Sequence, residues 1–160
     1  MSPNEFSPLI SEIKAERRNL SNIVEEMENL TNQLDDEPTG LELRAAGSIL
    51  HDYYTGLEKI FRLIALESDG NLPSGEEWHK RLLDRMAVEV EDLRPPVIDE
   101  SLKEQLSEYL RFRHVFRHIY GFELKWARCK PLVDRLPKMH QELAHRLDEF
   151  QNFLREINNC

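Results

Sequence analysis

The chain has 160 residues, a length that fits one hydrophobic core, and we expect residues 1–160 to form a single domain. Glycine (6 residues) and proline (8 residues) are sparse, and 32% of residues are charged against 40% hydrophobic, which excludes collagen-like, low-complexity and disordered chains. The 30 acidic and 21 basic residues leave a net charge of −9, which excludes a protein that coats nucleic acid by bulk electrostatics. Any nucleic-acid site must therefore be local.

The sequence shows no secretory signal and no apolar run long enough to span a membrane, so we expect a cytoplasmic protein. Its two cysteines, Cys129 and Cys160, are too few for a disulfide framework or a thiolate zinc site. We expect no cofactor and no metal, and we expect Cys129 to be a small buried hydrophobic side chain.

Apolar residues recur at helical spacing along nearly the whole chain, which predicts an all-helical fold. A near-heptad apolar stripe predicts a first helix over residues 7–35, entered at Ser7 and Pro8. Thr39 and Glu42 have the spacing of a capping box, and they predict a second, central helix that ends near residue 68.

The capping spacing recurs at Ser74 and Glu77, which predicts a third helix over residues 75–92. Pro95 and Pro96 would end it, because proline lacks the amide hydrogen and restricts the residue before it.

A fourth helix is predicted to begin at Asp99 or Ser101, and a last one to run from near Pro137 to Ile157. The end of the fourth helix stays open, because three residues could bend or interrupt it: Gly121, Pro131 and Pro137. Long helices with short connections predict a bundle of four or five helices.

The segment from Arg111 to His118 holds three arginines and two histidines without a single carboxylate. On a helix, Arg113 and Arg117 share one face, and His114 and His118 share another, because each pair is four residues apart. Such a local cationic surface in an acidic chain is suited to phosphate. An ordinary amphipathic helix, whose arginines pair with acids on neighbouring helices, would have the same pattern.

Residues 113–120 have the form R-x4-H-x-Y, and this resembles the signature of the HEPN domain family and, more narrowly, of HepT-like ribonuclease toxins. Residues 51–58 and 72–79 also resemble HepT-like sequences, so the resemblance covers most of the chain. It implies a small helical bundle that is the toxin of a toxin–antitoxin module, with a minimal nucleotidyltransferase as the antitoxin partner.

The resemblance also implies metal-independent RNA cleavage, in which the ribose 2'-hydroxyl attacks its own phosphodiester. Arg113 and His118 would be the catalytic residues, because a guanidinium can stabilise phosphoryl charge and an imidazole can exchange protons at neutral pH. His114 and Arg117 would support them. Tyr120 matches the tyrosine that the antitoxin adenylylates, and added phosphates there would occupy the site that RNA needs.

The motif imposes a geometric condition, because five residues along a regular helix rotate the side chain by about 500°, which leaves Arg113 and His118 roughly 140° apart. Either the helix distorts near Gly121, or two copies of the motif meet across a two-fold axis. The resemblance implies the second arrangement, so we expect a homodimer with the motif helices at the interface.

Two competing sites can be weighed. Glu76 with His79, and Glu142 with His145, match the ligand spacing of diiron bundles, but Glu142 and His145 should face solvent. The remaining polar and aromatic side chains are expected to be structural: Tyr53, Tyr54 and Trp78 in the core, and His140 and His145 in solvent. As an alternative, a cleft could be lined by His51, Tyr53, Tyr54 and Glu58. The alternative function is a non-catalytic helical module that binds a protein partner or RNA.

Overall fold

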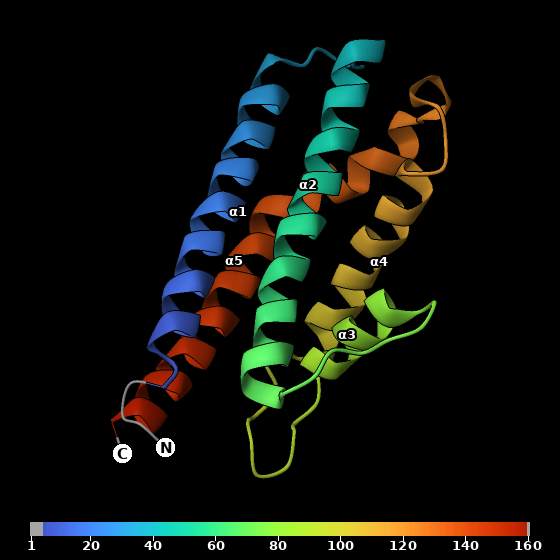
Figure 1. Cartoon of the computed structure of the whole chain (residues 1–160). Coiled ribbons are helices and arrows are strands. Elements are labelled where there is room, and N and C mark those ends of the chain that lie inside the picture. Colours follow the sequence, from blue (N-terminus) through green and yellow to red (C-terminus); the bar gives the residue numbers. More distant parts are fainter. Residues whose placement is uncertain (1–4, 160) are drawn as a thin grey trace.

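The computed structural model describes residues 5–159, and the predicted all-helical bundle is confirmed (Figure 1). The α-helices are α1 (Ser7–Gln33), α2 (Gly40–Ile64), α3 (Trp78–Met86), α4 (Glu100–Phe116) and α5 (Trp126–Asn158). Two short turns add a π-helical η1 (Ala65–Asp69) and a 3-10 helical η2 (Gly121–Glu123). Among these residues the only β-type pairing is an isolated bridge between Val90 and Arg94. None of the helices described is long and apolar enough to cross a membrane.

Helix α2 is the centre of the bundle, as its broad apolar stripe predicts. It packs against α1, α3, α4 and α5, while α3 lies at one end of the bundle against α2 and α4 (Figure 1). Its buried face includes Leu50, Leu57 and Phe61, which lie in one continuous core with side chains of every other α-helix. Residues of α2 therefore reach the inner sides of both α3 and α4.

The predicted starts of α2 and α4 are confirmed by their caps. The Thr39 hydroxyl accepts a hydrogen bond from the Glu42 amide at 3.2 Å, and the Glu42 carboxylate accepts one from the Thr39 amide at 2.8 Å. Asp99 caps α4, because its carboxylate accepts a hydrogen bond from the Leu102 amide at 2.8 Å. These contacts satisfy amides that have no partner inside the helix.

The third helix is shorter than predicted, and the expected cap at Ser74 and Glu77 is wrong, because Glu77 precedes Trp78 without a side-chain cap. Beyond Met86 the chain turns, and the Met86 carbonyl accepts hydrogen bonds from the amides of residues 97 and 98 at 2.8 and 3.1 Å. Buried Arg94 holds this loop through Asp69, with nitrogen–oxygen distances of 2.7 and 2.9 Å. Tertiary hydrogen bonds thus replace the last turns of the predicted helix.

The last helix begins 11 residues earlier than predicted, at Trp126 in place of Pro137, and it contains both Pro131 and Pro137. Proline removes one helical hydrogen bond, but the helix continues because buried side chains such as Cys129 and Leu136 keep packing into the core. Figure 1 shows α5 bending between its orange first turns and its red remainder, as proline inside a helix causes.

Candidate active site

The cationic segment lies at the end of α4, where the helix stops earlier than the spacing argument assumes. Phe116 is the last helical residue, and the His118 amide bonds to the Val115 carbonyl at 3.0 Å, a three-residue turn. His118 therefore follows a tighter path than a regular helix would give it. The chain therefore departs from regular helix geometry ahead of Gly121, as the first of the two arrangements requires, while the meeting of two motif copies in a homodimer stays a prediction.

A groove of about 620 Å³ lies between α3 and the end of α4, and Arg113, His114, Arg117 and His118 all line it. Four predicted site residues are thus together in one cavity of a single chain. His114, Arg117 and His118 are exposed, and the imidazole rings of His114 and His118 lie 4.5 Å apart between centroids. The predicted shared face of the two histidines is confirmed.

Arg113 differs from its neighbours because it is already paired with an acid. Its side chain is 11% exposed, and its Nη1 donates to Oε1 of Glu58 at 3.2 Å, across from α2. Its Nε is buried and has no hydrogen-bond partner within residues 5–159. The ordinary interpretation of the motif, an arginine paired with an acid on a neighbouring helix, is therefore correct for this residue, and the pair holds the guanidinium beside the groove.

Glu58 links Arg113 to a third element. Its side chain is 6% exposed, and its other oxygen, Oε2, lies 2.8 Å from Nδ1 of His79 on α3. The ring of Trp78 stacks on His79 at 3.7 Å between centroids. The sequence predicts Glu58 only as one of four residues that could line a cleft. The signal was its place four residues after buried Tyr54, since an acid on an apolar helix face needs a buried partner.

His118 has one ring nitrogen held by its own turn. Its Nδ1 lies 2.7 Å from the His114 carbonyl oxygen, and because a carbonyl can only accept, this contact assigns the proton to Nδ1. The lone pair of the neutral ring is then on the other nitrogen, Nε2, where a proton can be exchanged.

Tyr120 lies beside the groove and not in it. The residue is 71% exposed, and its ring stacks on Phe122 at 5.3 Å between centroids. Its backbone amide donates to the Glu123 carboxylate at 2.9 Å. Arg44 of α2 packs so closely against Gly121 that a Cβ there would lie 2.7 Å from Cζ of that arginine. Local packing therefore fixes the turn while the tyrosine ring stays accessible.

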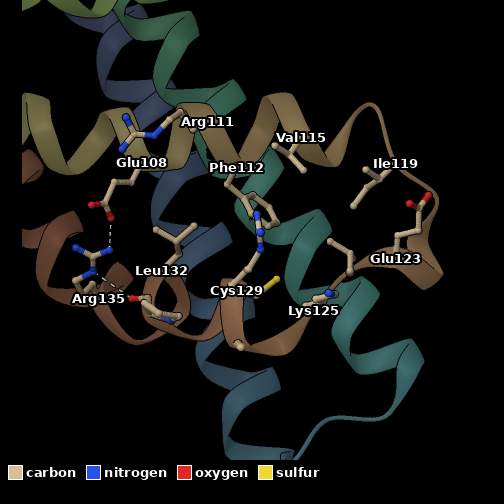
Figure 2. Close-up of a pocket in the computed structure, with 14 residues that line it drawn as sticks. Glu108, Arg111, Phe112, Val115, Ile119, Glu123, Lys125, Cys129, Leu132 and Arg135 are labelled. Atoms are coloured by element: carbon tan, nitrogen blue, oxygen red, sulfur yellow. Dashed lines mark hydrogen bonds and ion pairs between the residues drawn. The ribbon is translucent and has the colours of Figure 1, made fainter.

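Helix α4 has a second groove on its other side, about 660 Å³ in volume, between α4 and the start of α5 (Figure 2). Phe112, Ile119 and Leu132 make it mainly apolar, and Glu108 pairs with Arg135 near one end. Buried Cys129 also lines it, and burial raises the pKa of its thiol to about 11, which leaves it a weak nucleophile. No histidine is among the residues that line this groove, and of its two glutamates Glu108 is paired with Arg135.

The expected positions of the tyrosines and of Trp78 are confirmed, whereas that of His140 is not. Tyr53 and Tyr54 are buried, as expected, and Trp78 is partly buried against the core. The expectation that His140 is solvated is wrong, because its Nδ1 lies 2.8 Å from the Tyr53 hydroxyl. Burial, with a smaller effect of Arg17, lowers the pKa of His140. The spacing could not reveal this, since the two residues are 87 positions apart in the chain.

Glu142 and His145, which match the diiron spacing on α5, face solvent, as the sequence predicts. Glu142 is exposed, and the exposed imidazole of His145 pairs with Glu149 at 2.8 Å. Exposed Glu76 and the Glu58-bound His79 do not form the other half. In the described part of the chain no group of three or more His, Cys, Asp or Glu side chains could hold a metal ion.

A family of known proteins matches most of the chain. The family described as HepT-like protein matches residues 45–154, which run from the first turns of α2 almost to the end of α5 and include the whole groove. No curated protein and no solved structure matches the chain.

Proposed function

Because the chain belongs to the HepT-like family, we propose that it is the toxin of a toxin–antitoxin module and a metal-independent endoribonuclease of the cytoplasm. The family is generally associated with ribonucleases, which sets the reaction class. The observation that carries the proposal is that Arg113 and His118 line one groove of the chain.

The chemistry needs two functions that these residues can supply. Arg113 is always protonated and presents planar donors to phosphoryl oxygens as their charge grows in the transition state. Its pair with Glu58 holds it in place before RNA arrives. His118 exchanges a proton at Nε2, while His114 and Arg117 add positive charge on the exposed rim. The 2'-oxygen then attacks phosphorus, and the bond to the 5'-oxygen breaks.

The decisive experiment is RNA cleavage in EDTA. Wild-type protein should cut RNA and leave a cyclic phosphate, while Arg113→Ala and His118→Ala should each lose about 10²-fold or more in rate. His145→Ala is the matched control, because His145 is an exposed histidine on the solvent face of α5, and it should keep full activity. Equal rates for all four proteins would remove this groove from consideration.

Silencing by a minimal nucleotidyltransferase antitoxin is part of the same proposal. Tyr120 is 71% exposed, so an enzyme could reach its hydroxyl, and transferred AMP would set phosphate against the cationic rim next to it. Intact-mass spectrometry after co-expression with the antitoxin should show added AMP on wild type and none on Tyr120→Phe. AMP that persists on the variant would move the modification to another residue.

A non-catalytic binding module is the second candidate. It is favoured by the pair between Arg113 and Glu58, which already neutralises the central cation, and by the net charge of −9. The cleavage assay separates the two candidates, because a binding module would retain RNA or a protein partner without producing a cyclic phosphate.

A further inference from the structure

Outside the R-x4-H-x-Y motif, one more imidazole lines the same groove. His79 comes from the first turn of α3, and its side chain is 29% exposed. Its Nδ1 lies 2.8 Å from Oε2 of buried Glu58. Because an ionised carboxylate only accepts hydrogen bonds, the proton of the neutral ring is on Nδ1. The lone pair is therefore on Nε2.

The direction of that lone pair follows from the ring geometry. The two nitrogens of an imidazole point in widely different directions, so Nε2 is turned away from the Glu58 carboxylate, and His79 is one of the residues that line the groove. Arg113 Nη1 is 3.4 Å from Nδ1, but both atoms carry protons, so this contact is no hydrogen bond and does not compete with Glu58. Trp78 covers one face of the ring, and Arg62 lies over the Trp78 ring at 5.4 Å.

His79 and His118 therefore share one arrangement. In each ring Nδ1 lies within hydrogen-bond distance of a protein oxygen, at 2.8 Å in His79 and 2.7 Å in His118, so the lone pair of the neutral ring is on Nε2, and Arg113 lines the same groove. Cleavage by a neighbouring 2'-hydroxyl needs two proton transfers, one from the attacking oxygen and one to the leaving oxygen. Two imidazoles that line one groove together with Arg113 would supply both proton transfers.

We propose that His79 is the general base of this site and that His118 of the same chain is the general acid, an inference that rests on the proposed ribonuclease function. Nε2 of His79 takes the 2'-hydroxyl proton as O2' bonds to phosphorus, and His118, which enters this step as the imidazolium, gives its Nε2 proton to the 5'-oxygen as the P–O5' bond breaks. Glu58 is a positioning residue that stabilises the imidazolium formed on His79, as the acid of a catalytic triad does. The base is given to His79 because it alone of the two has a carboxylate partner.

An RNA with sulfur in place of the bridging 5'-oxygen tests the two roles separately, since a thiolate leaves without a proton. On ordinary RNA, His79→Ala and His118→Ala should each lose about 10²-fold or more. On the sulfur-bridged RNA the His118→Ala loss should largely disappear, while the His79→Ala loss should remain. Full activity of His79→Ala, or rescue of that variant by the sulfur substrate, would overturn the assignment.

Controls distinguish a failure of the His79 assignment from a failure of the proposed ribonuclease function. His145→Ala should match wild type on both substrates, and circular dichroism should show intact helices in each variant. If His79→Ala does not fold, His79→Gln, which keeps a polar contact for Glu58 but cannot transfer a proton at neutral pH, must show the same pattern. An inactive wild type would refute the ribonuclease function itself, whereas an active wild type with unaffected His79 variants would refute only the base.

Mixed dimers test the placement of both groups on one chain. When His79→Ala and His118→Ala chains are co-expressed with different tags and the heterodimer is purified, every groove lacks one imidazole, so activity should stay as low as in the single variants. Recovery of about half the wild-type rate would place the two groups on opposite chains and overturn the proposal.

Discussion

At the scale of single residues, Glu58 is the side chain on which the site depends most. It is buried in α2, and its two oxygens contact Arg113 of α4 and His79 of α3. A carboxylate is costly to bury, and two partners offset that cost. Glu58 therefore links α2 to α3 and α4, and both of its partners are residues that line the groove.

Replacing Glu58 with leucine should destabilise the protein by about 3–5 kcal/mol, because it leaves the mostly buried Arg113 guanidinium without its partner. Urea unfolding followed by circular dichroism measures this. Adding Arg113→Met to the same chain should restore much of the loss, because the uncompensated charge is then gone. The surface variant Glu149→Leu is the control and should change stability by roughly 0.5 kcal/mol or less. A Glu58→Leu protein as stable as wild type would contradict the importance of the pair.

At the scale of elements, local signals and tertiary contacts compete at each helix end. The capping box of α2 lies where the sequence predicts it, whereas the same spacing at Ser74 and Glu77 forms no cap. At the second site the chain turns before the helix: Gly75 has a positive φ of 99°, the Trp78 amide bonds to the Gly75 carbonyl at 3.3 Å, and the Arg81 guanidinium bonds to the Ser74 carbonyl at 3.1 Å. A cap motif is a local preference, and such contacts can override it.

Thr39→Ala should cost about 1 kcal/mol of stability, because the Glu42 amide loses the side-chain oxygen that caps it. Thermal unfolding compares this variant with Thr39→Ser, which keeps a hydroxyl at the same position and should stay close to wild type. If the serine variant loses as much as the alanine variant, the threonine methyl group and not the cap is what stabilises this end of α2.

At the scale of the whole molecule, the homodimer that the resemblance to the family leads us to expect stays a prediction, and it would bring the ends of two α4 helices together. Val115 is 43% exposed and lies at the end of α4, between the two grooves that line its sides. A dimer interface formed by α4 would bury the exposed apolar side chain of Val115.

Val115→Lys should shift the protein from dimer to monomer in light scattering, because burying two unpaired ammonium groups at a two-fold interface is costly. Lysine is chosen so that the groove keeps its attraction for RNA. Val88→Lys is the control, since Val88 is 52% exposed in the loop after α3, and it should leave the dimer intact. If the wild-type protein is a monomer in light scattering and still cleaves RNA, the predicted dimer is refuted.

Periodicity, caps and motif spacing act over a few neighbouring residues, so the amino-acid sequence is enough to predict the helical class, the starts of α2 and α4, and the cationic segment from Arg111 to His118. Only the tertiary structure decided that α5 passes through Pro131 and Pro137, that His140 bonds to Tyr53, and that Glu58 joins Arg113 to His79. Each of these depends on residues 21 or more positions apart in the chain or on core packing strong enough to outweigh a broken helical hydrogen bond.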